Sequence, residues 1–189
     1  QAVRVVSDGG PDTEGPGVRL RGREALSELF HFTIDVRATD EPFPAGPGAR
    51  GELRFLRDGE TFRSVFGLFA RVALRLDGDG KHPTHRLTLV PRAHRLTMVT
   101  TQQIFMDLSV QDIARRKSKL VGLRDEDVRW NVLGDDPERE FIVQYRETDL
   151  TLLSRLAENR GVAFYFAHED GADRLVFSDH NDGLMSDDA

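Results

Sequence analysis

The chain has 189 residues, of which 39% are hydrophobic and 31% charged, so it can bury a substantial core and is not disordered by composition. Its net charge of −6, with basic and acidic residues interleaved, argues against the basic face or stripe of a nucleic-acid-binding protein. The lack of cysteine excludes disulfides, thiolate metal sites and cysteine nucleophiles. We expect no membrane-spanning helix and no cleavable signal peptide.

The first half of the sequence predicts β-strands separated by turns. The clearest strand runs from Phe30 to Ala38, where apolar and polar residues alternate and the buried face carries Phe30, Phe32, Ile34 and Val36. The preceding segment, Gly22 to Leu29, is ambiguous between a helical turn and an irregular bend. After the strand, Asp40 to Gly51 is rich in proline and glycine and predicts a loop.

A hairpin and a long strand are predicted next. Glu52 to Arg57 forms the first strand, and Asp58-Gly59 is typical of a tight hairpin turn. In the following strand, apolar residues at every second position from Phe66 to Leu76 predict one continuous buried face. Because this strand is unusually long, we expect it to curl or to carry a bulge, with Gly67 as the candidate position.

The first half closes with a returning strand. A turn at Asp77 to Gly80 leads into His85 to Val90, in which Leu87 and Leu89 point inward. Strands at such short intervals, without helical periodicity, indicate an antiparallel barrel or sandwich, because closure of the sheet hides its unpaired edges.

Near Met98 the pattern changes to α+β. Ser109 to Asp112 resembles a capping box, and Gly122 closes the predicted helix, whose apolar stripe comprises Val110, Ile113, Ala114 and Leu120. The chain has a single short basic run, which we interpret as the solvated face of this helix: Arg115, Arg116, Lys117 and Lys119.

A second helix and a hairpin complete the second half. The helix runs from about Asp149 to Arg160 and ends at Gly161, and its apolar face must be buried against a partner: Leu150, Leu153, Leu156 and Ala157, flanked by Leu152. Two strands follow, Val162 to Ala167 and Arg174 to Ser178, joined by a turn.

Four clusters were weighed as cation sites and rejected. His82 and His85 flank a proline at the start of a strand. The runs His168 to Asp170 and Asp179 to Asp182 are typical of solvated turns rather than ligand sets. Asp77 to Gly80 lacks the spaced acids and the closing glutamate of a calcium loop.

Catalytic motifs are also missing from the sequence. It has no G-x-S-x-G elbow, P-loop or dinucleotide fingerprint. Ser27, near Glu24 and His31, is better explained as a turn serine than as a nucleophile. Trp130 and Tyr145 lie in stretches that also predict core strands rather than a stacking platform. We therefore assign no catalytic, cofactor-binding or metal-binding residue and predict that the protein is not an enzyme.

Four stretches in order along the chain share the pattern of one family: Leu20 to Phe32, Arg86 to Pro91, Ile104 to Ile113 and Gln144 to Phe166. The last is the most specific, since it contains QYRETDL and LLSRLAENRGVAFYF. Together they resemble the VgrG spike proteins of type VI secretion systems. Two positions depart from the family pattern: Leu152 stands where phenylalanine is usual, and Arg92 where many members carry an aromatic residue.

This resemblance implies a fold shared with the hub of phage tail baseplates, mainly β with α+β. Residues 1–98 would form a first tube-type antiparallel β-barrel. Residues 99–189 would form a small α+β domain with two helices and a β-hairpin, inserted between two barrels of a longer parent protein.

The resemblance also implies a structural role without cofactors. The parent would assemble as a homotrimer that caps the hexameric tail-tube protein, contacts baseplate components and carries effector cargo, without binding nucleic acid. It would assemble in the cytoplasm and be expelled by the contractile apparatus without a signal peptide.

Two alternative functions remain open at this point. One is the equivalent hub of a phage tail or an extracellular contractile injection particle, which neighbouring genes for sheath, tube and ATPase components would distinguish. The other is an unrelated hydrolase or ligand-binding β-module, which a deep pocket with convergent polar side chains would favour.

Overall fold

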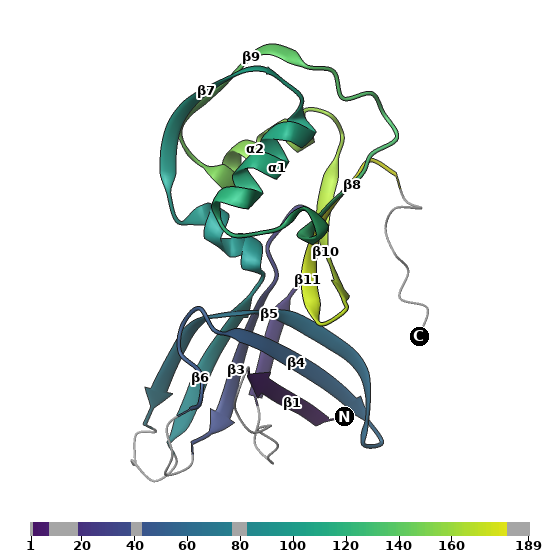
Figure 1. Ribbon diagram of the computed structural model, residues 1–189. Coiled ribbons are helices and arrows are strands. Elements are labelled where there is room, and N and C mark those ends of the chain that lie inside the picture. The colour runs from purple at the N-terminus through teal and green to yellow at the C-terminus, as the bar shows by residue number, and fades with distance from the viewer. Residues whose placement is uncertain (1, 8–18, 39–42, 77–82, 181–189) are drawn as a thin grey trace.

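The computed structural model describes residues 2–7, 19–38, 43–76 and 83–180. Figure 1 shows two regions stacked along the long axis of the molecule: a curled sheet, here called the sheet region, and above it the α+β region. The strands of the sheet region are β1 (Ala2–Ser7), β2 (Arg19–Arg23), β3 (His31–Arg37), β4 (Arg50–Arg57), β5 (Glu60–Arg75) and β6 (Thr84–Val90).

The α+β region begins with a short 3-10 helix, η1 (Arg92–Thr97), and contains a second one, η2 (Asp125–Asp127). Its two α-helices are α1 (Val110–Leu120) and α2 (Asp149–Glu158). Its strands are β7 (Thr100–Leu108), β8 (Val128–Asn131), β9 (Arg139–Thr148), β10 (Ala163–Glu169) and β11 (Ala172–Ser178).

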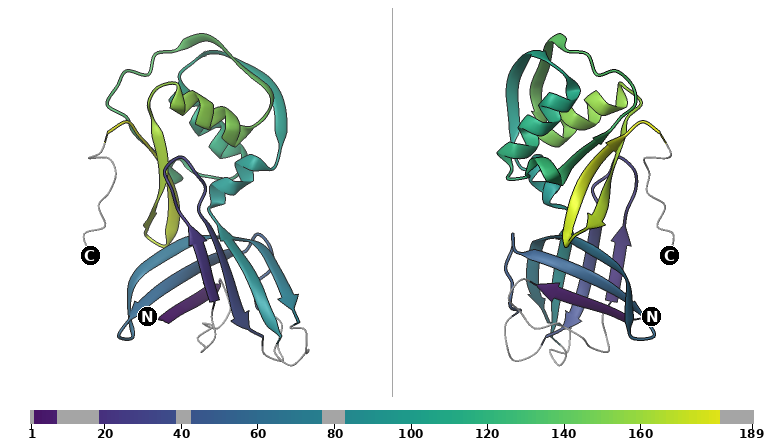
Figure 2. Two further views of the ribbon diagram at one scale, coloured as in Figure 1. Left: turned by 180° about the vertical axis from the view of Figure 1, so that it is seen from behind. Right: turned by 45° about the vertical axis from the view of Figure 1, so that its right-hand side comes forward.

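The six strands of the sheet region form an antiparallel sheet in the order β1-β4-β5-β6-β3-β2. Figure 2 shows that the sheet curls strongly. Closure into a barrel requires the first and last strands to pair, and among the described residues β1 and β2 form opposite edges. The structure is therefore a half-barrel, and the prediction of a closed barrel is wrong for this part of the chain.

The predicted alternation of β3 is confirmed. Phe32, Ile34 and Val36 are buried in the core of the sheet region, together with Leu87 and Leu89 of the neighbouring β6. The predicted hairpin turn between β4 and β5 is also present.

The two central residues of the turn between β4 and β5 have the positive φ angles of a tight hairpin turn, 55° at Asp58 and 88° at Gly59. The loop predicted to end at Gly51 is shorter than expected, because β4 already begins at Arg50.

The long strand β5 carries a bulge, as predicted, but not at the expected place. Its register against β6 shifts between Phe69 and Arg71. Before the shift Val65 and Phe69 face the core, and after it Val72 does, because one inserted residue reverses which side chains point inward. The predicted continuous face from residue 66 to 76 is therefore wrong. Gly67 instead allows β6 to approach, since a Cβ there would lie 2.3 Å from a backbone oxygen of β6.

The predicted start of α1 is confirmed and its stripe is partly wrong. The Ser109 hydroxyl accepts a hydrogen bond from the Asp112 amide at 3.1 Å, and the Asp112 carboxylate accepts one from the Ser109 amide at 3.3 Å. Gly122, with φ of 82°, follows the helix. Leu120, however, is 71% exposed, and the next residue, Val121, packs against the core in its place.

The second helix and the hairpin match the prediction closely. In α2, Leu152, Leu153, Leu156 and Ala157 are buried, whereas Leu150 is only half-buried. Strands β10 and β11 pair antiparallel through a two-residue turn at Asp170-Gly171, which is tighter than expected. Strand β8 adds to β11 in parallel, and β7 pairs with β9 as a separate two-stranded sheet.

The tip of the β10–β11 hairpin rests on the sheet region, as the two views of Figure 2 show. The Phe66 amide donates a hydrogen bond to Nδ1 of His168 at 3.1 Å. The rings of Phe30 and Phe166 meet edge to face, with their centroids 5.3 Å apart. These contacts join the two hydrophobic cores at the waist of the molecule.

Candidate assembly interface

The two-stranded sheet β7–β9, here called the ribbon, curves over the two helices at the top of Figure 1. Its inner face carries Phe105 and Ile142, which are buried against the helices. The ribbon register pairs three further positions across the outer face: Gln102 with Tyr145, Ile104 with Val143, and Met106 with Phe141.

The outer face of the ribbon is apolar and open to solvent. Its large side chains are between 43% and 64% exposed: Ile104, Met106, Phe141, Val143 and Tyr145. An antiparallel sheet with one buried face usually presents polar side chains on the other. Exposed apolar patches of this kind are typical of interaction surfaces. The prediction that Tyr145 lies in a core strand is therefore wrong, because its strand faces outward at that position.

A buried polar network holds the ribbon on the helices. Lys117 Nζ of α1 lies 2.8 Å from Asp149 Oδ1 at the start of α2 and 3.2 Å from Gln103 Oε1 of β7. Gln144 of β9 donates to the same Asp149 oxygen at 2.9 Å. Lys117 is only 2% exposed and lies 5.4 Å from the centroid of the Phe105 ring. Its assignment to a solvated basic face is therefore wrong.

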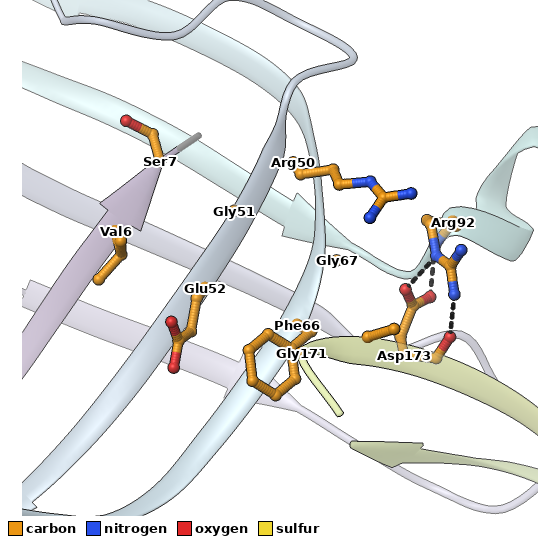
Figure 3. Close-up of a pocket in the computed structure, with 11 residues that line it drawn as sticks. Val6, Ser7, Arg50, Gly51, Glu52, Phe66, Gly67, Arg92, Gly171 and Asp173 are labelled. Atoms are coloured by element: carbon orange, nitrogen blue, oxygen red, sulfur yellow. Dashed lines mark hydrogen bonds and ion pairs between the residues drawn. The ribbon is translucent and has the colours of Figure 1, made fainter. Parts of the chain in front are cut away.

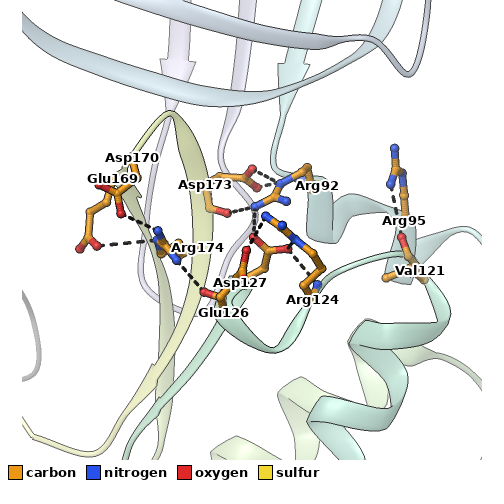
Figure 4. A network of polar contacts seen from close by, with 10 residues as sticks. All are labelled: Arg92, Arg95, Val121, Arg124, Glu126, Asp127, Glu169, Asp170, Asp173 and Arg174. Atoms are coloured by element: carbon orange, nitrogen blue, oxygen red, sulfur yellow. Dashed lines mark hydrogen bonds and ion pairs between the residues drawn. The ribbon is translucent and has the colours of Figure 1, made fainter.

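A second buried network lies at the waist, between η1, η2 and β11 (Figure 4). Arg92 Nε donates to Asp173 Oδ1 at 2.6 Å, and Arg92 Nη2 donates to Asp127 Oδ1 at 2.8 Å. The Arg92 amide donates to Asp173 Oδ2 at 2.7 Å. Arg92 stands where the VgrG pattern often has an aromatic residue, and here it forms a charged link between segments far apart in sequence.

Burial and pairing shift the pKa values of this network in different directions. Burial raises the pKa of Asp173, and the attraction of Arg92 offsets it only in part. Burial also opposes the charged forms of Arg92 and Asp127. Hydrogen bonds to Asp127 and Asp173 nevertheless raise the pKa of Arg92, and those from Arg92 and the Arg124 amide lower the pKa of Asp127. The arginine stays charged and joins two carboxylates.

A cavity of about 210 Å³ lies between the sheet region and the tip of the β10–β11 hairpin, beside the contacts that join them (Figure 3). Glu52 lines it, and although burial opposes its charge, hydrogen bonds from Arg54 and Ser64 lower its pKa. Ser7 also lines it, and its buried Oγ has no partner in the described part of the chain. The Arg92–Asp173 pair closes the far wall. Glu52 is bound by Arg54 and Ser64, and Arg92 by Asp173, so these three charged lining groups already have partners.

Of the possible ligand pair His82 and His85, the structure describes only His85. His82 lies outside the described residues. His85 is buried on the core side, with its ring 5.8 Å from that of Phe43. The carboxylates after His168 are bound by arginines, Glu169 by Arg129 and Asp170 by Arg174. Within the described ranges, no group of three or more possible ligands is placed to hold a metal ion.

Ser27, the possible nucleophile, stabilises a bend of the backbone. The Ser27 amide donates to the backbone oxygen of Phe164 at 2.7 Å, and its φ of 57° marks an irregular bend rather than a helical turn. Glu24 binds Arg63 instead of supporting Ser27, and His31 is exposed. Trp130 packs on Phe177 with ring centroids 5.1 Å apart.

The sequence and the fold both match a known protein family. Residues 23–188 match the phage tail baseplate hub (GPD) family. The chain belongs to this baseplate hub family. Its hub fold is similar to that of the E. coli c3393 protein, described as a type VI secretion component with structural similarity to the T4 tail proteins gp27 and gp5. The TM-score is 0.76 at 22% identity, covering 96% of this hub chain and 50% of that chain.

Sequence relatives of the hub chain confirm the resemblance to VgrG spike proteins. It is 34% identical over 177 residues to the type VI secretion system spike protein VgrG3 of Vibrio cholerae, covering 86% of this chain and 17% of the relative. It is 31% identical over 172 residues to spike protein VgrG1a of Pseudomonas aeruginosa, covering 87% and 26%.

One relative of the hub chain is described as a toxin. It is the actin cross-linking toxin VgrG1 of Vibrio cholerae, with 35% identity over 135 residues, covering 71% of this chain and 12% of the relative. The hub chain therefore spans between about a tenth and a quarter of the length of these relatives. Across the described residues, none of the helices is both long and apolar enough to traverse a membrane.

Proposed function

We propose that this chain is a structural part of the hub or spike of a type VI secretion machine. In this proposal the parent protein is a homotrimer that caps the hexameric tail tube, contacts baseplate components and carries effector cargo. It assembles in the cytoplasm and is expelled by the contractile apparatus. The observation that carries the proposal is the apolar outer face of the ribbon, in a chain that belongs to the baseplate hub family.

The role is mechanical rather than enzymatic. A hub transmits the force of contraction, so its segments must move as one body. The Arg92 network ties η1 to β11 and η2, and the Lys117 network ties α1 to α2 and the ribbon. Removing one partner from such a buried pair leaves an uncompensated charge, which makes partial opening costly.

We further propose that residues 1–98 and 99–189 form two domains, with the second inserted between two barrels of the parent. The two hydrophobic clusters support two domains, since one gathers the sheet region and the other the helices. Ala93 and Leu96 pack in the second cluster, which favours a boundary near residue 91 over one at residue 98. Limited proteolysis tests the division: the first cut should fall at residues 40–51 or within 91–101, where residues 98–100 are exposed. A first cut within α2 would contradict it.

A secretion assay with the full-length parent gene tests the function. A double variant, Ile104→Asp with Val143→Asp, places charges at paired positions on the outer face of the ribbon. We expect release of tube protein into the medium to fall at least about tenfold, because a charge at an interface core opposes burial. Leu120→Asp is the matched control, since Leu120 is an exposed apolar residue on α1, outside the ribbon.

Two results would contradict the proposal. One is normal release in a strain that lacks the parent gene. The other is a monomeric parent protein in native mass spectrometry. A phage-tail hub is the second candidate, because the fold also matches the 43 kDa tail protein of prophage MuSo2 from Shewanella oneidensis with a TM-score of 0.65. The genes beside the parent gene separate these two machines.

A further inference from the structure

The outward side of the curled sheet gathers arginines from four strands. On β3 the core residues Phe32, Ile34 and Val36 define the inward side, so the residues between them point outward. Residues paired across neighbouring strands point to the same side of the sheet, so the pairing identifies the outward residues of β2 on one flank and of β6 and the end of β5 on the other. Seven arginines occupy it. Arg23 is paired with Glu28, and the other six are here called the arginine face: Arg19, Arg21, Arg37, Arg71, Arg75 and Arg86.

One carboxylate lies among these arginines and pairs with one of them. Among the outward positions of β2, β3, β6 and residues 71–75 of β5, Asp35 is the only acidic residue. It accepts from Arg86 Nε at 2.6 Å and from Arg86 Nη2 at 2.5 Å. Arg19 lies opposite Asp35 in the register and lines the same cavity. The hydrogen bonds from Arg86 chiefly lower the pKa of Asp35, and the charges of Arg75 and Arg19 add to this. The other five arginines form no ion pair within the described residues.

The face is hollowed at its centre. A cavity of about 210 Å³ is lined by Arg19, Arg21, Thr33, Asp35 and Arg86. It is several times the roughly 30 Å³ that one water occupies in the liquid, so it can admit a side chain. Its lining offers guanidinium groups, which bind carboxylates through paired hydrogen bonds.

The arginine face ends at β2, an edge strand among the described residues. Strand β2 pairs only with β3 among the described strands, so its other side exposes backbone N–H and C=O groups. Charged residues on an edge strand can serve merely to prevent pairing between copies. That explanation covers Arg19 and Arg21, but not Arg86, Arg71 and Arg75, which lie on interior strands.

We propose that β2 and the arginine face bind an acidic protein segment that adds to the sheet as a strand. The backbone of the segment would pair with the free edge of β2, and its alternate carboxylates would lie over Arg19 and Arg21. The longer-range charge of Arg75 and Arg71 would attract the segment and fix its orientation. This inference goes beyond the proposed hub role and does not require it.

A protein segment fits this surface better than a nucleic acid does. Single-stranded nucleic acids bind through aromatic side chains on which the bases stack. The outward positions of these strands carry no aromatic residue of the Phe, Tyr or Trp type.

A binding experiment on the purified full-length protein tests the proposal. The probe is a fluorescent ten-residue peptide of alternating glutamate and valine, and the readout is anisotropy at low salt. Arg21→Glu with Arg75→Glu should weaken binding at least about tenfold, because two attractive charges become repulsive. Arg116→Glu, an exposed arginine of α1, is the matched control and should change the affinity less than about twofold.

A second probe separates strand addition from simple attraction. The same peptide, N-methylated at alternate residues, keeps its charge but cannot form the ladder hydrogen bonds, so it should also bind at least about tenfold more weakly. Circular dichroism checks that both variants are folded. The proposal is overturned if the peptide does not bind, if Arg116→Glu weakens binding as much as the double variant, if N-methylation has no effect, or if a single-stranded oligonucleotide of equal charge binds more tightly.

Discussion

The outward sheet faces of the two regions differ in chemistry. In the sheet region the outward positions of β2, β3, β6 and the end of β5 carry mostly arginine and threonine, whereas on the ribbon they carry mostly isoleucine, methionine, phenylalanine, valine and tyrosine. Both faces belong to antiparallel strands with a buried apolar inner side. The difference shows that burial of the inner side does not fix the chemistry of the outer side, which is charged in one region and apolar in the other.

The link between the two regions gives the largest expected effect. Arg92→Ala should reduce the free energy of unfolding by about 3–5 kcal/mol, because Asp173 and Asp127 would stay buried without their counter-charge. Urea denaturation measures this. Arg23→Ala, which breaks an exposed pair with Glu28, is the control and should leave the urea midpoint nearly unchanged. Equal losses in the two variants would contradict a special role for the waist network.

The two sides of the ribbon can be compared directly. Phe105→Ala on the inner face should cost about 3–5 kcal/mol, since it removes a buried ring from the core. Phe141→Ser on the outer face should cost less than about 1 kcal/mol in the isolated chain, because its side chain is already exposed. Thermal and urea unfolding of both variants provide the measurement. A large loss for Phe141→Ser would mean that the outer face is packed within the chain itself.

The helix beneath the ribbon provides a comparison within one element. Leu153→Ala should lower the free energy of unfolding by about 2–5 kcal/mol, because Leu153 is fully buried. Leu150→Ala should cost clearly less, since that side chain is half-buried. A change below about 0.5 kcal/mol for Leu153→Ala would refute the burial of this face.

The smallest effect concerns pH. A hydrogen bond with His180, together with those from the Leu133 and Gly134 amides, lowers the pKa of Asp179 from 3.8 to about 2. The unfolded chain therefore binds the proton first, and the stabilisation is complete above about pH 4 and is lost as the pH falls toward 2. Asp179→Asn should make the urea midpoint less dependent on pH between about 5 and 2. An unchanged slope would show that the contact contributes nothing.

Local signals explain what was predicted correctly. The alternation in β3 and β6, the capping box at Ser109, the glycine after α1 and the hairpin turns all depend on residues within a few positions of one another. Their geometry follows from backbone hydrogen bonding and side-chain periodicity, which act over one turn of helix or one pair of strands. The second helix and its leucines belong to the same class.

Features that depend on distant segments were not predicted. Strands β1, β2, β7, β8 and β9 lack a strong local pattern and are defined by their partners in the sheets. The bulge in β5 reverses the buried side at a position that alternation alone cannot locate. Lys117 belongs to a basic run, and only the carboxylate of Asp149, 32 positions along the chain, explains its burial.

The sequence by itself determined the family, the strand and helix types with strong periodicity, and the lack of cysteine chemistry, because these depend on residue identity and local spacing. Only the tertiary structure decided which faces are open. It brought arginines from four strands onto one side and apolar residues from two strands onto the ribbon, because strand pairing places side by side residues that are far apart in the chain.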